Sequence, residues 1–252
     1  MKLDRMIAVR TNKTVWRDDG LCLKAFDESY SRSAVFGEAT NLARVADEGL
    51  PVPELLEVRR LDGHWTIITE YVRGKNLEQL LSEKPEKRGE YLELFVKTQI
   101  EINSKTCPHL VKLRDRIIRK LPATDLEATL RFDLIRRLEA MPVRDRLLHG
   151  DLEPSNLILS DDGKIVILDW SRASQGNVEA DAAKAWLRFR INEGESAAEE
   201  YLRVWCDLSG GSERTVREWI PIIAASEAMD GYEQDRELCH RIAKNYKFHE
   251  LG

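Results

Sequence analysis

The chain has 252 residues, of which 42% are hydrophobic and 33% are charged, a composition typical of a globular protein rather than a disordered or fibrous one. Its 44 acidic residues outnumber its 39 lysines and arginines, and no basic stripe marks a nucleic-acid binder. The longest stretch without a charged side chain is far shorter than the roughly 20 residues that a membrane-spanning helix needs. We therefore expect neither nucleic acid nor a membrane as a partner.

The first residues mix charges and lack the apolar segment of a secretory signal. The four cysteines show neither the spacing of a metal site nor that of a redox pair, and they lie at positions 22, 107, 206 and 239. We expect reduced thiols and a cytoplasmic protein.

The front part of the chain is predicted to form antiparallel strands around one helix. Two strands are expected within residues 5–26, joined by a turn at Asp18-Asp19-Gly20, a strong hairpin signal. Helical periodicity over residues 33–48 is followed by Gly49, which is typical of a helix end. Strands at 55–60 and 65–70 complete the predicted order of strand, strand, helix, strand, strand.

The remainder of the chain is predicted to be mostly helical. A single hairpin interrupts it, formed by apolar runs at 157–159 and 165–168 around Asp161-Asp162-Gly163. Helices are expected at roughly 76–83, 88–104, 110–120, 124–140, 179–193, 195–207, 213–229 and 231–246.

The segment His149-Gly150-Asp151-Leu152-Glu153-Pro154-Ser155-Asn156 precedes this hairpin, and Asp169-Trp170 follows it. Because a tight hairpin returns the chain, Asn156 and Asp169 can lie side by side at one end of it. Phosphoryl transfer assisted by magnesium needs a carboxylate for the attacking hydroxyl and oxygen ligands for the metal. Asp and Asn at strand ends also serve as plain turn formers, but that explains the joint pattern poorly.

At these residues the sequence resembles the aminoglycoside phosphotransferase and choline kinase family, a branch of the protein-kinase-like fold. The resemblance implies that Asp151 is the catalytic base and that Asn156 and Asp169 bind Mg²⁺. It also implies a two-lobed α+β fold: an antiparallel-sheet lobe with one helix at 1–70, a hinge at 71–75 and a mainly helical lobe at 76–252. ATP or GTP is then the phosphate donor.

The kinase pattern also requires a strand lysine on the phosphates and a helix glutamate that pairs with it. Lys24 is the strand candidate, and Glu38 falls on the apolar side of the predicted helix, where an unpaired carboxylate is costly. The alternatives to this ion pair are that Lys24 is a solvated lysine on an edge strand and that Glu38 lies at the rim of the apolar face and reaches water. The connector that begins at Glu70 and includes Val72 is expected to meet the nucleotide base. No glycine-rich phosphate loop follows the first strand, and contacts from Asn12, Lys13 or Thr14 are open candidates there.

We expect a small molecule with a hydroxyl group as the phosphate acceptor, because only eleven residues separate Asp169 from Asp181 and no long activation segment is present. The C-terminal helices would bind it. They carry tryptophans that are more typical of a core, and acidic residues that form either a solvated face or a wall for a polycation: Glu227, Asp230, Glu233 and Asp235. A non-catalytic nucleotide-binding module and a reduced protein kinase are the rival interpretations. The sequence leaves the acceptor, the choice between ATP and GTP and the oligomeric state open.

Overall fold

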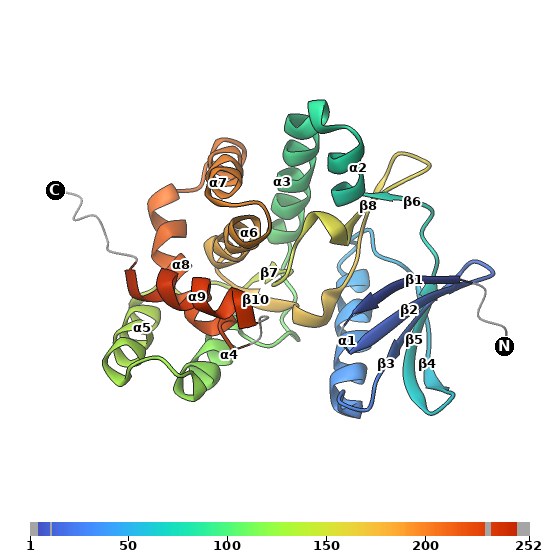
Figure 1. The fold of residues 1–252 in the computed structure, drawn as a ribbon, viewed down its shortest axis with the longest axis horizontal. Coiled ribbons are helices and arrows are strands. Elements are labelled where there is room, and N and C mark those ends of the chain that lie inside the picture. The colour runs from blue at the N-terminus through green and yellow to red at the C-terminus, as the bar shows by residue number, and fades with distance from the viewer. Residues whose placement is uncertain (1–4, 11, 230–232, 246–252) are drawn as a thin grey trace. The chain divides into compact units, whose positions relative to one another are not determined.

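The computed structural model describes residues 5–10, 12–229 and 233–245, and it divides into two compact units (Figure 1). The first unit comprises Met1–Tyr91 and Pro154–Arg172, and the second comprises Leu92–Glu153 and Ala173–Gly252. The predicted hairpin and Asp169 therefore belong to the same compact unit as the N-terminal sheet. The boundaries of the lobes expected from the sequence, 1–70, 71–75 and 76–252, stay a prediction.

The first unit contains a five-stranded antiparallel sheet in the order β1-β2-β3-β5-β4. Its strands are β1 (Arg5–Arg10), β2 (Lys13–Asp18), β3 (Leu21–Phe26), β4 (Leu55–Leu61) and β5 (His64–Glu70). Three strands thus precede the first helix, where the sequence predicted two. The turn between β2 and β3 uses Asp19 and Gly20 at positive φ, the backbone twist that two-residue hairpins require.

Helix α1 (Arg32–Asp47) packs on one face of this sheet (Figure 1). The Ser31 hydroxyl accepts a hydrogen bond from the backbone N–H of Ala34 and caps the first turn. The core beneath the helix consists of buried apolar side chains from three elements, namely Phe26, Val35, Ala39 and Ile67. This packing fixes the side of α1 from which Glu38 projects.

A second, three-stranded sheet completes the first unit in the order β6-β8-β9. Its strands are β6 (Gly74–Asn76), β8 (Leu157–Ser160) and β9 (Ile165–Ile167), and helix α2 (Leu77–Glu83) follows β6. The sequence predicted the β8–β9 hairpin but read residues 70–74 only as a connector. Gly74 at φ +147 lets β6 approach β8 closely, since a Cβ there would lie 2.3 Å from the carbonyl oxygen of Leu159.

The second unit is built mainly from helices, in agreement with the sequence. They are most of α3 (Arg88–Ser104), α4 (Leu113–Lys120), α5 (Ala128–Ala140), α6 (Val178–Asn192), α7 (Glu195–Ser209), α8 (Glu213–Glu227) and α9 (Glu233–Asn245), with a small two-stranded sheet of β7 (Arg146–Leu148) and β10 (Ser174–Gly176). Helix α6 is buried along most of its length and contacts both α7 and α8. The tryptophans of this region, Trp186, Trp205 and Trp219, are core residues.

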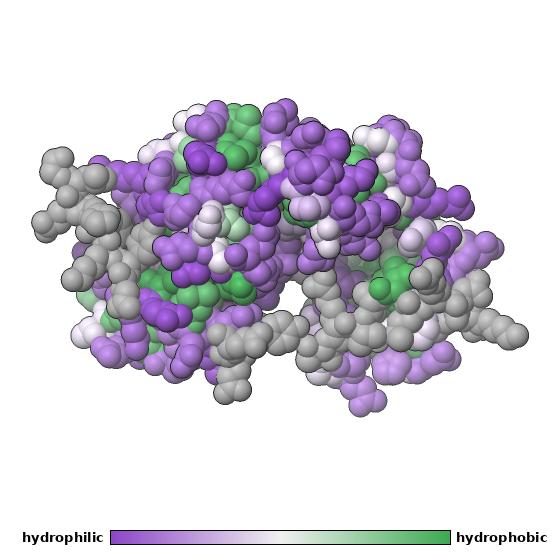
Figure 2. All heavy atoms as spheres, turned by 45° about the horizontal axis from the view of Figure 1, so that its top comes forward, coloured by the Kyte–Doolittle hydropathy of each residue, from purple (hydrophilic) through white to green (hydrophobic). Residues whose placement is uncertain are grey.

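Hydrophilic side chains cover most of the face shown in Figure 2, and hydrophobic ones emerge there in small separate areas. Among the residues that the structure describes, no helix is both long enough and apolar enough to span a membrane.

We predict that Gly74→Ala lowers the free energy of unfolding by at least about 2 kcal/mol, because the added methyl group meets backbone atoms at a positive φ. Urea denaturation would measure the change. Gly89→Ala is the matched control: Gly89 lies in α3 with open space around its Cα, so alanine there should stabilise by up to about 1 kcal/mol. Equal effects at the two positions would contradict the close approach of β6 and β8.

Candidate active site

Three of the predicted site residues meet within the first unit. The Lys24 ammonium on β3 contacts Glu38 Oε1 on α1, so the predicted ion pair is present in the structure. The same ammonium lies 3.3 Å from Asp169 Oδ2, in the loop after β9. One lysine thus joins the sheet, the helix and the loop, and its role toward a nucleotide stays a prediction.

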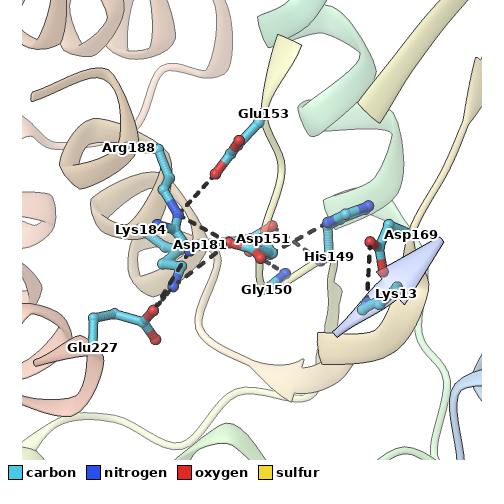
Figure 3. Close-up of polar contacts among 10 residues, drawn as sticks. All are labelled: Lys13, His149, Gly150, Asp151, Glu153, Asp169, Asp181, Lys184, Arg188 and Glu227. Atoms are coloured by element: carbon cyan, nitrogen blue, oxygen red, sulfur yellow. Dashed lines mark hydrogen bonds and ion pairs between the residues drawn. The ribbon is translucent and has the colours of Figure 1, made fainter. Parts of the chain in front are cut away.

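A second lysine reaches the same two carboxylates. Lys13 at the start of β2 places Nζ 3.7 Å from Glu38 Oε2 and 3.8 Å from Asp169 Oδ2, and Figure 3 shows its contact with Asp169. Asn12, Lys13 and Thr14 were the open candidates for phosphate contacts between the first two strands. Of these three, the structure brings Lys13 to this cluster. The register of β2 against β3 accounts for this, because Lys13 begins the strand that pairs with the strand of Lys24.

The charges in this cluster shift one another's titration. Burial alone would raise the pKa of Asp169, but Lys24 and Lys13 hold that pKa well below its usual range. Burial works to lower the pKa of Lys24, whereas the carboxylates of Asp169 and Glu38 raise it above its ordinary value. Burial and the neighbouring charge of Lys24 lower the pKa of Lys13. The cluster therefore holds the ionised Asp169 carboxylate against cations in a partly desolvated place.

The loop that carries Asp169 is fixed from both sides. Asp169 itself has φ +57, a left-handed conformation that Asp tolerates better than most residues. The Trp170 indole donates a hydrogen bond to the carbonyl of Ile167 at 3.2 Å, and the Trp170 carbonyl accepts one from Asn41 Nδ2 on α1 at 3.1 Å. The backbone N–H of Leu168 donates to the carbonyl of Asn156 at 2.8 Å, so the hairpin does bring Asn156 and Asp169 to one end of itself.

A cavity of about 650 Å³ opens beside this cluster, entirely within the first unit. Its size falls in the range of small-molecule and cofactor sites. Every predicted nucleotide or metal residue of the first unit lines it: Lys24, Glu38, Glu70, Val72, Asn156 and Asp169. Lys13 lines it as well, so its wall carries both cations and oxygen ligands.

The oxygen atoms at this wall fit a magnesium ion. Asp169 Oδ1 is buried and has no hydrogen-bond partner in the part of the chain that the structure describes. Asn156 is buried at the same cavity and can supply an amide oxygen. No group of three or more His, Cys, Asp or Glu side chains that could hold a metal is found among the described residues. Magnesium is commonly bound through one or two carboxylates plus phosphates.

Asp151 lies in the second unit, in the loop after β7. The His149 ring is fully buried, and its Nδ1 accepts a hydrogen bond from the backbone N–H of Asp151 at 3.3 Å. Asp181 at the start of α6 accepts the backbone N–H groups of His149 at 3.2 Å and Gly150 at 2.8 Å, and also the Asn103 amide at 3.1 Å. Through these bonds, His149 and Asp181 hold the backbone of the loop in place.

Two cations that the sequence did not suggest surround the Asp151 carboxylate. Lys184 and Arg188 project from α6 toward it, on the same face as Asp181 because the spacing is three and seven residues (Figure 3). Three charged positions on one face of a mostly buried helix were the available signal. Glu153, two residues after Asp151, forms an ion pair with Arg188 at 2.9 Å.

The predicted acidic set is only partly described. Glu227 on α8 contacts the Lys184 ammonium, so its charge is compensated within the second unit. Asp230 lies outside the described residues, and of the side chain of Glu233 nothing is described.

A family model described as the phosphotransferase enzyme family matches residues 7–219 of the chain. The chain belongs to this family. The match spans both units and includes Lys24, Asp151 and Asp169. No curated protein sequence matches the chain.

Solved structures share the kinase-like fold at low sequence identity. A thermostable mutant of aminoglycoside phosphotransferase APH(4)-Ia, in a ternary complex with AMP-PNP and hygromycin B, is 18% identical with a TM-score of 0.70, covering 96% of this chain and 92% of its own. A choline/ethanolamine kinase family protein from Mesorhizobium loti is 17% identical with a TM-score of 0.66, covering 98% and 88%. Choline kinase LicA from Streptococcus pneumoniae is 15% identical with a TM-score of 0.66, covering 96% and 91%.

The predicted kinase-like fold and the predicted enzyme class are thereby confirmed. The chain is a phosphotransferase of the class that acts on hydroxyl groups of small molecules.

We predict that Asp181→Ala lowers the free energy of unfolding by on the order of 3 kcal/mol, because it leaves two backbone N–H groups of the loop that carries Asp151, one buried and one partly buried, without their acceptor. Urea denaturation of the full chain measures this. Glu179→Ala, in the same first turn of α6, is the control and should change stability by less than about 0.5 kcal/mol. An Asp181→Ala protein as stable as the control would show that water replaces the carboxylate.

Proposed function

We propose that the chain transfers the γ-phosphoryl group of ATP or GTP, in the presence of Mg²⁺, to a hydroxyl group of a small molecule. The observation that carries this proposal is the cluster of Lys24, Lys13, Glu38 and Asp169 on the wall of the 650 Å³ cavity. Two cations and an unsatisfied carboxylate oxygen in one cavity suit a metal-bound polyphosphate.

The nucleotide would occupy the cavity of the first unit. Lys24 and Lys13 would exchange their contacts with Asp169 for the phosphate oxygens, while Glu38 keeps Lys24 in place. The backbone groups of Glu70 and Val72, which line the same cavity, would face the base. The carbonyl of Glu70 already accepts the Thr69 hydroxyl at 3.1 Å, which fixes its direction and leaves it a second lone pair for a base amino group.

Asn156 and Asp169 would hold the metal, as their oxygen atoms at the cavity wall permit. When bound, Mg²⁺ neutralises charge on the β- and γ-phosphates and so favours departure of the nucleoside diphosphate.

Asp151 would act as the base for the acceptor. The acceptor hydroxyl gives its proton to the Asp151 carboxylate, and its oxygen forms the new bond to the γ-phosphorus. The bond between that phosphorus and the β–γ bridging oxygen breaks, and the nucleoside diphosphate leaves with the electron pair. Asp151 precedes Asn156 by five residues, so a short peptide segment links the proposed base to the proposed metal ligand.

The acceptor would be a small molecule, such as an aminoglycoside, choline, ethanolamine, a sugar or a hydroxyl-bearing amino acid. Only η4 (Trp170–Arg172) and the three-residue strand β10 lie between Asp169 and α6, which leaves little chain to bind a protein substrate. The need for a nucleoside triphosphate agrees with the cytoplasm as the proposed location.

We predict that Mg-ATP or Mg-GTP raises the melting temperature of the wild-type protein and that Asp169→Ala weakens this shift, because the metal loses a carboxylate. A ligand at 100 times its dissociation constant adds about 2.7 kcal/mol to the folded state, which a thermal melt detects readily. Asp162→Ala, in the exposed turn of the same hairpin, should keep the full shift. No shift with either nucleotide at millimolar concentration would argue against the kinase mechanism.

We predict that Asp151→Asn lowers turnover by roughly 10²–10⁴-fold while leaving stabilisation by Mg-nucleotide intact, since a positioned base acts on the chemical step. Nucleoside diphosphate release would be measured with hygromycin B, choline, ethanolamine, homoserine and water as acceptors. Asp145→Asn, an exposed residue before β7, is the control. Near-wild-type turnover in Asp151→Asn would rule out the assigned role.

A further inference from the structure

The carboxylate of Asp151 is engaged by one arginine. Two nitrogen atoms of Arg188 donate to its Oδ1, Nε at 3.0 Å and Nη2 at 2.9 Å (Figure 3). Two charge-assisted bonds that converge from a planar guanidinium on one carboxylate oxygen hold that atom in place from a fixed direction, which a flexible lysine does less well. Such an arrangement on a proposed base calls for an account of what the arginine does there.

We propose that Arg188 is a positioning residue for Asp151: Arg188 aims the Asp151 carboxylate at the acceptor hydroxyl and keeps that carboxylate ionised between turnovers. The inference rests on the proposed function, in which Asp151 is the base. Nothing in the sequence motif around Asp151 supplies this cation, because the neighbouring charged position of the loop is Glu153.

Arg188 is itself held by other carboxylates. Its Nε lies 2.9 Å from Glu153 Oε1, and its Nη2 lies 3.8 Å from Glu227 Oε2. Its side chain is 19% exposed, so these contacts are only partly screened by water. Burial alone would lower the pKa of Arg188, but Asp151, Glu153 and Glu227 raise it, so the guanidinium stays charged. Because Glu153 and Glu227 also hold Arg188, the guanidinium cannot move freely with the Asp151 carboxylate, and it therefore restrains that carboxylate.

Lys184 is a second cation beside Asp151, at a longer distance than Arg188. Its side chain is 4% exposed; its ammonium contacts Glu227 and lies 3.6 Å from Asp151 Oδ1. Removal of Arg188 would leave three carboxylates, Asp151, Glu153 and Glu227, facing one lysine. Other groups near the loop include the His149 ring, which accepts the Asp151 backbone N–H, and Asp181, which accepts two backbone N–H groups of the loop. The Cys239 thiol on α9 interacts electrostatically with Glu227, Lys184 and Arg188, and burial raises its pKa. The balance would then favour protonation of Asp151, since two like charges beside it outnumber one cation.

The cation need not impair the proposed base. In the loose transition state of phosphoryl transfer, little charge develops on the attacking oxygen until late, and orientation contributes most. A weakly basic but correctly aimed carboxylate is adequate for a proton that is transferred late. Arg188 thus makes the Asp151 carboxylate less basic, which this reaction tolerates. It also keeps that carboxylate ionised and correctly oriented, which the reaction requires.

Titration of Asp151 tests the inference directly. The protein is labelled with ¹³Cγ-aspartate, and Asp151→Asn assigns the Asp151 signal. Arg188→Met is expected to move the midpoint of the Asp151 titration to higher pH by about 1–3 units, because an opposite charge in contact is lost. Arg190→Met is the matched control: Arg190 lies on the same helix and pairs with the exposed Glu195 at 3.2 Å, so the midpoint should not move.

Turnover supplies the second readout, with the acceptor that gives the fastest nucleoside diphosphate release. The acidic limb of kcat should shift upward with the titration, because activity is lost as pH falls through the higher pKa of Asp151. At the optimum, Arg188→Met should lower kcat roughly 10- to 100-fold, the effect expected of a misplaced reacting group. Arg188→Lys keeps the charge but not the two bonds that converge on Oδ1; it should restore the acidic limb and leave kcat low. Stabilisation by Mg-ATP should be unchanged in both.

The outcomes separate the inference from the function on which it rests. If Arg188→Met leaves both the titration and the acidic limb in place, or lowers kcat equally at every pH, the positioning role is wrong while the phosphotransferase stands. If the KM for the acceptor rises with kcat unchanged, Arg188 binds the acceptor and the inference is also wrong. If Arg188→Met does not fold, Arg188→Lys decides: wild-type kcat in that variant overturns the proposal. Absence of both nucleotide stabilisation and turnover in the wild type would defeat the proposed function itself.

Discussion

Every charge that the fold withdraws from water near the candidate site must be compensated by an opposite one, and this constraint arranges the residues around it. A buried unpaired ion costs several kcal/mol, of the same order as the stability of a whole domain. In the first unit, Glu38 and Asp169 are balanced by Lys24 and Lys13. The lysines join a strand pair, a helix and a loop at one point, so the contacts that pack these elements together also form part of the cavity wall.

The second unit meets the constraint in a different way. Its charges come from the two helices α6 and α8 and from the loop after β7, and they alternate in sign. The loop backbone is held separately, by the Asp181 carboxylate and the buried His149 ring. Backbone and side chain of Asp151 are thus restrained by different partners, which permits the side-chain contacts to change without loss of the loop.

Much of this could be read from the sequence, and the physical reasons for the failures are specific. Long periodic helices and hairpins with Asp-Gly turns carry local signals, and so the helices and the β8–β9 hairpin were predicted. The pairing of Lys24 with Glu38 followed because a carboxylate on an apolar helix face demands a partner. The strands β6, β7 and β10 have three residues each, too few to show alternation, and their pairing is set by partners far along the chain. Lys184 and Arg188 were not predicted, and Lys13 stayed one of three candidates, because a side-chain contact across elements has no fixed spacing in the sequence.

The same charge balance bears on what the acceptor can be. From the sequence, the C-terminal acidic residues were expected to form either a solvated face or a wall that would attract a polycation. In the structure, Glu227 forms ion pairs with Lys184 and Arg188, and Glu153 forms one with Arg188. Neither carboxylate therefore presents its full negative charge to an incoming molecule. A kinase-like fold accommodates many acceptors, and the choice among them is made by the groups around the base rather than by the fold. Around Asp151 these groups include two cations, and an acceptor must therefore be recognised against a mixed field of charge rather than a purely acidic one.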